Sequence, residues 1–291
     1  MARSSPKLII RLSGGLGNQM FQYAFGRAIA GDRELFFDAH SYRKDGLRDV
    51  ALSCFGINLN ERMPDAPVRI LSSIPGMWRF MRAFRGRVSL LGTTVVWDRL
   101  SGFSPLAASA SGSVYAIGYW QDERYFAGIE ADLRRIFSLD GPLHQETQAL
   151  LESAPVSIGV QVRRGDYLDS RVSMVHPSPS LDYFRSAVGS LLEKHGTHEV
   201  IVCTDDVEWA KAHLRFPCDK VSFRCENVPD HEDMLLLSRC SHIVISNSSF
   251  GWWSAWLGAG SGDVICPNRW YGDAVPGYAH PGVESWIRME C

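Results

Sequence analysis

Two adjacent arginines follow an apolar run in the second half of the chain and are its clearest chemical feature. The run at 156–162 is typical of a buried strand, and Arg163 and Arg164 come directly after it. Guanidinium groups pair with phosphate oxygens through two parallel hydrogen bonds, so two fixed cations at a strand end suit a phosphate-rich ligand. The alternative is a structural arginine that holds a loop by an ion pair, because charge clusters are often structural.

Two further polar clusters follow strands in this half. Thr204-Asp205-Asp206 follows the strand expected at 200–203, and Asn247-Ser248-Ser249 follows the one expected at 242–246. Strands and helices alternate here, which predicts a parallel sheet with helices on both faces. Ligands bind outside the carboxyl ends of such strands, so the clusters should gather on one rim. The serines open a helix whose N–H groups bind anions, and together with the arginines they predict a diphosphate site without metal.

The acidic residues of this half allow two interpretations. Asp205 and Asp206 could hold a divalent ion that neutralises a diphosphate, but the arginines can supply that charge. The structural alternative, for at least one of the two, is the N-cap of the helix expected from Val207. Asp233 stands in an otherwise apolar helix and is either a first-turn helix acid or a ligand contact.

A glycine-rich turn, Gly14 to Gln19, lies between a strand expected at 7–12 and a helix that runs to Ile29. This pattern is typical of a dinucleotide-binding turn, and Asp38 lies at about the distance along the chain where an acid that binds the ribose is expected. Met20, however, occupies the position of the third glycine of that fingerprint. NAD binding therefore stays an alternative, beside a purely structural tight turn, and the amides after Gly17 are expected to face a cleft.

Composition excludes several classes of protein. The chain has 291 residues, 45% hydrophobic and 21% charged, with a net charge of −2. This describes a globular protein of two lobes and gives no field that would attract nucleic acid. No apolar run approaches the roughly 18 residues that span a bilayer. The start of the sequence lacks the apolar core of a signal peptide, and an odd count of seven cysteines favours a reduced, cytoplasmic chain.

The pattern divides the chain into lobes at 1–150 and 151–291, with a hinge expected at 139–155. Residues 40–110 show more turn signals than periodicity. A strand is expected at 115–119 and a helix at 123–137.

In their order and spacing, these blocks resemble the bacterial α-1,2-fucosyltransferases of glycosyltransferase family 11. The similarity spans most of the chain, although residues 40–150 carry little of it. The matching blocks are Gly14-Gly15-Leu16-Gly17-Asn18-Gln19-Met20-Phe21-Gln22-Tyr23-Ala24, Arg163-Arg164-Gly165-Asp166-Tyr167, Thr204-Asp205-Asp206 with Trp209, and Asp233-Met234 through Ser246-Asn247-Ser248-Ser249-Phe250-Gly251-Trp252-Trp253-Ser254-Ala255-Trp256-Leu257.

The resemblance implies an α/β fold of the GT-B kind, with two Rossmann-like lobes whose parallel sheets face each other across a cleft. It implies inverting, metal-independent transfer of L-fucose from GDP-fucose to the 2-hydroxyl of a terminal β-galactoside, in synthesis of an O-antigen-type surface polysaccharide. No cofactor is expected. A lipid-linked acceptor would bring the protein to the cytosolic side of a bacterial inner membrane, as a peripheral contact without a membrane span. The alternatives are an NAD-dependent oxidoreductase and a non-catalytic glycan-binding protein.

The resemblance also assigns roles to residues. Arg163 should hold the β-phosphate, Asp233 should meet the guanine, and Asn18 should lie beside the diphosphate from the opposite lobe. Asp166 is a candidate general base, with an acid at 38–125 as the alternative. The family usually has histidine where this chain has Gln161, which puts that nucleotide contact in doubt. The expected donor-binding residues are Gly15, Gly17, Asn18, Gln19, Gln161, Arg164, Thr204, Asp205, Asp233, Ser248, Ser249 and Phe250.

Overall fold

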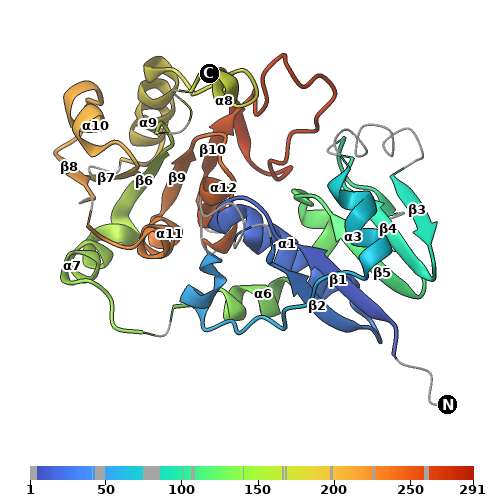
Figure 1. The fold of residues 1–291 in the computed structure, drawn as a ribbon. Helices are drawn as coiled ribbons and strands as arrows, with labels where there is room; N and C mark the ends of the chain where they lie inside the picture. Colours follow the sequence, from blue (N-terminus) through green and yellow to red (C-terminus); the bar gives the residue numbers. More distant parts are fainter. Residues whose placement is uncertain are drawn as a thin grey trace. The chain divides into compact units, whose positions relative to one another are not determined.

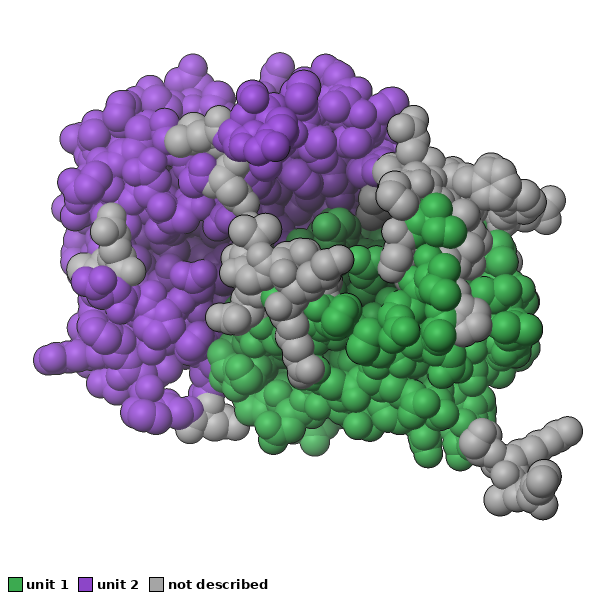
Figure 2. Space-filling model, viewed as in Figure 1, with its two compact units in different colours: residues 1–137 green, residues 138–291 purple. Residues whose placement is uncertain are grey.

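The computed structural model describes residues 5–40, 42, 50–74, 86–99, 101–105, 109–139, 141–165, 167, 169–196, 199–224, 227–258 and 262–291. The chain forms two compact units, residues 1–137 and 138–291, called unit 1 and unit 2 below and coloured separately in Figure 2. Among the described residues, no helix is both long and apolar enough to cross a lipid bilayer.

Unit 1 has a five-stranded sheet in the order β2-β1-β5-β4-β3. Four strands are parallel, while β3 pairs antiparallel with β4 in a hairpin that the sequence pattern did not reveal. The helix expected at 123–137 is divided in two, because Gly128 adopts a φ of 96° between the pieces. The elements are β1 (Lys7–Arg11), α1 (Leu16–Ile29), β2 (Glu34–Asp38), η1 (Ala51–Phe55), α3 (Ala66–Ser73), β3 (Arg87–Leu90), β4 (Thr93–Trp97), β5 (Ser113–Ile117), η2 (Glu123–Phe126) and α6 (Glu130–Ile136).

Unit 2 has a six-stranded sheet in the order β11-β10-β9-β6-β7-β8, and every pairing is parallel. This is the doubly wound order of a Rossmann fold, which reverses between β6 and β9. The predicted Rossmann-like lobes are confirmed. The elements are α7 (Gln145–Ser153), η3 (Ala154–Val156), β6 (Ser157–Val162), α8 (Ser170–Ser173), α9 (Leu181–His195), β7 (Glu199–Thr204), α10 (Val207–His213), β8 (Lys220–Phe223), α11 (Asp230–Arg239), β9 (His242–Ile245), α12 (Ser249–Leu257), β10 (Val264–Pro267) and β11 (Ile287–Met289) (Figure 1).

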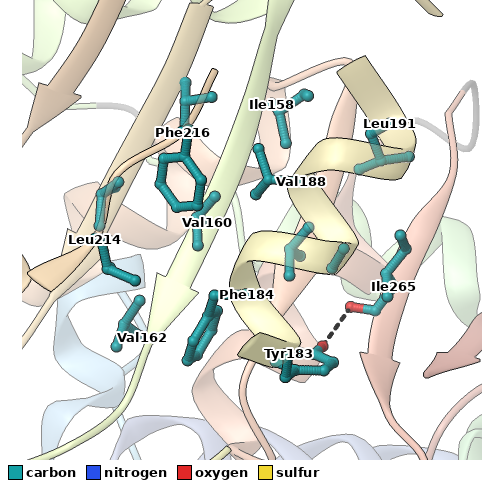
Figure 3. Close-up of a cluster of buried hydrophobic side chains, with 14 of the residues drawn as sticks. Ile158, Val160, Val162, Tyr183, Phe184, Val188, Leu191, Leu214, Phe216 and Ile265 are labelled. Atoms are coloured by element: carbon teal, nitrogen blue, oxygen red, sulfur yellow. Dashed lines mark hydrogen bonds between the residues drawn. The ribbon is translucent and has the colours of Figure 1, made fainter. Parts of the chain in front are cut away.

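Strand β6 is buried on both faces, and its residues alternate between two helix layers. Val160 packs on one face, in a cluster with Phe184 and Val188 of α9 (Figure 3). On the other face, a Cβ added to Gly159 would come within 3.0 Å of Leu237 in α11, so this helix packs close to the strand. Two covered faces explain why the strand is an unbroken apolar run in the sequence.

A buried carboxylate joins α7 to unit 2. Glu232 of α11 is 5% exposed, and it accepts hydrogen bonds from the backbone N–H of His144 and from the hydroxyl of Thr147. Both donors lie before residue 150, so the expected boundary at 150 cuts through a helix that packs within unit 2. The compact units divide after Phe137 instead, and the segment expected as a hinge contains α7.

Candidate functional site

The carboxyl ends of β6 and β9 lie side by side where the strand order of unit 2 reverses. Ligands bind at this position in open parallel sheets. The backbone N–H of Arg163 donates to the Ser246 hydroxyl at 2.9 Å, and that hydroxyl donates to the carbonyl of Gln161 at 3.0 Å. The structure therefore brings the arginine and serine clusters together on one rim, as the strand pattern predicts.

Arg163 is held by the acid that follows the neighbouring strand. Its Nη1 lies 3.0 Å from Oδ2 of Asp205, and the two side chains are 30% and 25% exposed. Asp205 also accepts the backbone N–H groups of Arg164 at 2.8 Å and Gly165 at 3.1 Å. The ion pair is thus at the surface, and three contacts fix the carboxylate that orients the guanidinium.

Unlike Arg163, Arg164 makes contacts that hold the local structure together. Its Nη1 lies 3.0 Å from Asp206, and its guanidinium lies over the Trp209 ring, 4.4 Å from the centroid. Asp206 caps α10 by accepting the backbone N–H of Trp209, and its own N–H donates to the Thr204 hydroxyl at 3.1 Å. Asp206 therefore takes the N-cap role, and Arg164 fastens the β6 loop to α10.

The start of α12 forms the other side of this rim. The Ser248 hydroxyl caps the helix by accepting the N–H of Phe250 at 3.2 Å, and this serine is 7% exposed. Ser249 and Phe250 occupy the first turn and are half-buried. The first N–H groups of a helix have no partner inside it, and the helix dipole favours negative charge there. This end of α12 therefore suits a phosphate beside Arg163.

Gln161 lies beneath the start of α12, away from the surface. Its side chain is 4% exposed, and its Oε1 accepts the N–H of Ser246 at 3.3 Å. A Cβ added to Gly251 would come within 2.6 Å of the same oxygen. The residue faces the helix layer because alternate positions of β6 do so. In the structure Gln161 positions β9 and α12, and the expected contact with the nucleotide stays a prediction.

The glycine turn of unit 1 lies at the equivalent edge of its own sheet, after β1. Gly14 adopts a φ of 80°, and Gly15 begins α1 without a side-chain cap. Gly17 is buried in the first turn. Asn18 is half-buried, and its Oδ1 accepts from Nε2 of Gln121 at 2.7 Å. This amide therefore stands at an uncapped helix start, as its expected role beside a phosphate requires.

Two expectations for this turn need correction. Gln19 is fully buried, and its Oε1 accepts the N–H of Ala51 at 2.8 Å, so it holds η1 and does not face a cleft. Asp38 is 8% exposed, and one of its oxygens accepts the Tyr115 hydroxyl at 2.7 Å. Met20 is completely buried. Asp38 is already hydrogen-bonded to Tyr115, and Met20 replaces the third glycine of the fingerprint. The NAD interpretation therefore lacks its ribose contact.

Of the remaining predicted residues, Asp166 lies outside the described part of the chain. Asp233 is in the first turn of α11, where its Oδ1 accepts from Nε of Arg224 at 2.5 Å. Burial raises the pKa of Asp233 to about 6, although the adjacent guanidinium opposes this rise. Sequence reasoning missed Arg224, whose only signal was a charged residue directly after the strand at 220–223.

One group of side chains in the described residues could converge on a metal ion. His195, His242 and Asp263 offer ligand atoms that lie within 4.8 Å of one another. His242 begins β9 and Asp263 precedes β10, so the group lies at the edge of the sheet opposite Arg163. Nζ of Lys194 pairs with Asp263 at 2.6 Å and supplies a cation there. This group is therefore separate from the rim.

Comparison with known proteins identifies the family. Residues 101–280 match the family described as Glycosyl transferase family 11. The chain is 31% identical to an α-1,2-colitosyltransferase of Escherichia coli, over 97% of this chain and 99% of that protein. It is 25% identical to the O-antigen biosynthesis glycosyltransferase WbnK of E. coli, over 96% and 99% of the two chains. Human galactoside alpha-(1,2)-fucosyltransferase 1 is 27% identical over 47% of this chain and 40% of its own length. This chain belongs to glycosyltransferase family 11 and is a glycosyltransferase.

Proposed function

We propose that the enzyme transfers L-fucose from GDP-fucose to the 2-hydroxyl of a terminal β-galactoside, with inversion and without a metal ion. The observation that carries this proposal is the position of Arg163. It lies at the strand-order reversal of unit 2, where its backbone N–H donates to Ser246, a residue that lies shortly before the start of α12. The names of the relatives support an α-1,2 linkage, since they include a colitosyltransferase and a galactoside fucosyltransferase.

The chemistry explains why a cation and a helix start are needed. The acceptor oxygen forms a bond to C1 of fucose, the bond from C1 to the β-phosphate oxygen breaks, and GDP leaves with the electron pair. Negative charge therefore grows on the diphosphate, where Arg163 and the first N–H groups of α12 stabilise it. One preorganised donor of this kind contributes about 3 kcal/mol to lowering the barrier. Asp205 contributes by fixing the guanidinium before the reaction.

The acceptor hydroxyl must lose its proton to a general base. Asp166 is our candidate, and an acid at 38–125 is the alternative. Within that interval Asp38 is unsuitable, because it is buried and hydrogen-bonded to Tyr115. We place the reaction on the cytosolic side of the inner membrane, on a lipid-linked O-antigen-type acceptor, since WbnK is named for O-antigen biosynthesis.

A second donor is favoured by one observation, the 31% identity to a colitosyltransferase. Colitose is L-fucose that lacks the 3-hydroxyl, so a GDP-colitose donor presents the same diphosphate to Arg163. The two donors differ only at the 3-hydroxyl of the sugar ring, so the proposed phosphate contacts would bind either of them.

Donor screening tests the proposal. The protein is incubated with GDP-fucose, GDP-colitose, GDP-mannose and UDP-galactose, each with a β-galactoside, with and without EDTA, and nucleotide release is measured. We expect release from GDP-fucose that EDTA does not reduce, and an α-linked product by NMR. Release only from UDP-galactose, or loss of activity in EDTA, would refute the donor or the metal-free mechanism. Quenching of NADH fluorescence without a response to GDP would support the oxidoreductase. Galactoside binding that needs no nucleotide and survives Arg163→Ala would support a glycan-binding protein.

A further inference from the structure

The turn that follows β5, residues 118–121, has an unusual backbone. Trp120 adopts a φ of 57°, in the left-handed region that bulky residues rarely occupy. Gly118 has a φ of 156°, and a Cβ added to it would come within 2.0 Å of the Asp98 side chain, so a side chain does not fit there. Strained conformations persist only where their surroundings hold them, and they cluster at functional sites. The turn therefore directs attention to what it positions.

Three side chains hold this turn in place. Asp98 directly follows β4, and its Oδ2 accepts the backbone N–H groups of Tyr119 at 3.2 Å and Trp120 at 2.7 Å. Gln22 is fully buried in α1, and its Nε2 donates to the carbonyl of the first turn residue at 2.9 Å. The buried Trp120 ring stacks on Phe25 of α1, with 4.0 Å between the ring centroids. The turn is thus fixed to α1 and to the end of β4, all within unit 1.

The last residue of the turn contacts the start of α1. Nε2 of Gln121 donates to Oδ1 of Asn18 at 2.7 Å, and both side chains are half-buried. An amide has its acceptor on one side and its donors on the other, so this bond fixes which way the Asn18 amide faces. Its Nδ2 lies over the glycine turn, since a Cβ added to Gly14 would come within 2.4 Å of it. The donor therefore lies at a helix start that has no side-chain cap, where an anion is favoured.

We infer that Gln121 is a positioning residue: it fixes the amide of Asn18 so that Nδ2 donates to a phosphate oxygen of the donor nucleotide. The inference rests on the proposed function, in which Asn18 lies beside the diphosphate, and adds the residue that determines which side of the amide faces it. The opposite orientation would present a carbonyl oxygen to an anion, which is repulsive. Without Gln121 the amide could rotate, so binding would have to order it. The strained turn keeps Gln121 within reach of Asn18.

The test compares GDP with guanosine, which has the same base and ribose but no phosphate. Dissociation constants are measured by calorimetry, directly for GDP and by competition against GDP for guanosine. In Gln121→Met the side chain keeps its length but loses the amide, and GDP should bind about three- to fivefold more weakly. In Asn18→Ala the loss should be about tenfold, because a hydrogen bond to a charged group disappears. Guanosine affinity should stay unchanged in both variants.

The double variant tests whether Gln121 acts through Asn18. With alanine at position 18, Gln121→Met should cause no further loss of GDP affinity, because the group that it orients is absent. Independent effects would instead multiply.

A second substitution at the same position reverses the expected orientation. Gln121→Glu keeps the shape of the side chain, but at about pH 7.5 its carboxylate is ionised and accepts from Nδ2 of Asn18, which turns the amide round. It should weaken GDP more than Gln121→Met does, and this difference should shrink in the Asn18→Ala background. Gln148→Glu is the matched control, because it adds the same charge at an exposed position of α7 and should leave GDP affinity unchanged. If thermal unfolding shows that Gln121→Met does not fold, Gln121→Glu decides the question.

A merely structural role for Gln121 would weaken GDP and guanosine together, or would give multiplied effects in the double variant. Either result, or unchanged GDP affinity in Gln121→Met, would overturn the inference and leave the proposed function intact. Failure of the unaltered protein to bind GDP, with tight binding of UDP, would overturn the proposed function instead. The same comparisons made with UDP and uridine would then decide the role of Gln121 separately.

Discussion

Replacing Arg163 by alanine should separate catalysis from stability more clearly than any other single change. The substitution removes the guanidinium, but it keeps the backbone N–H that donates to Ser246, so the rim itself should stay in place. We therefore expect a folded enzyme with very low turnover.

The structure sets the size of both effects. The Arg163–Asp205 pair is 30% and 25% exposed, and partly solvated pairs of this kind contribute about 0.2–1 kcal/mol to folding. In a protein of this size, 1 kcal/mol corresponds to a Tm change of about 2–4 °C. A lost donor to a developing anion costs about 3 kcal/mol in the barrier, which lowers turnover roughly 10²-fold or more.

The assay follows GDP release from GDP-fucose at saturating donor and records thermal unfolding in parallel. Arg171→Ala is the matched control, because Arg171 lies in the same unit and pairs with Asp169 at 2.9 Å, but is 85% exposed. It should keep normal turnover. Arg163→Lys should recover only part of the activity, because an ammonium cannot form two parallel bonds to a phosphate. Turnover of Arg163→Ala within a few-fold of the unaltered enzyme would refute the assigned role.

Four further changes, one of pH and three of single residues, test other parts of the structure. Because burial raises the pKa of Asp233 to about 6, GDP affinity measured by calorimetry should fall as the pH drops below that value. This group's contribution to the free energy of unfolding should instead decrease as the pH rises from about 4 to 6, since the folded state binds the proton more tightly. Gly251→Ala places a Cβ 2.6 Å from the Gln161 amide and should lower both GDP affinity and stability, the latter by about 1–3 kcal/mol. Gly189→Ala, where no atom lies within 4 Å, should stabilise the protein by up to about 1 kcal/mol in the same denaturation experiment. Thr147→Val leaves a buried carboxylate without one donor and should cost about 1–3 kcal/mol in urea unfolding.

The fold of unit 2 was predictable because local and global signals agree there. The helix from Leu181 to His195 has a serine cap and a terminal Gly196, and the structure has the same bounds. The strand at 220–223 is also found as expected. The β3–β4 hairpin of unit 1 was missed, because only Gly92 of its two turn residues gives a turn signal, while Leu91, at a φ of 46°, does not.

The site was predictable to the level of strand ends but not of side-chain direction. The pattern placed Arg163 and Ser248 on one rim, and the structure brings their segments together. It could not show that Gln19 and Gln161 point inward, because that depends on which helix layer each residue faces. Nor could it show the Arg224–Asp233 pair, which joins two elements across a loop.

The hydrogen bonds from His144 and Thr147 to Glu232, which join the start of α7 to α11, determine where the polypeptide can be divided for study. A fragment beginning at residue 151 would lack the donors of His144 and Thr147 and leave the buried carboxyl of Glu232 without these hydrogen bonds, at a cost of roughly 1–3 kcal/mol for each. A fragment beginning at Ser138 would keep these hydrogen bonds to Glu232, together with Arg163, Ser248 and the whole six-stranded sheet. We therefore expect the longer piece to keep the packing of unit 2, and it is the one to test for GDP binding without unit 1.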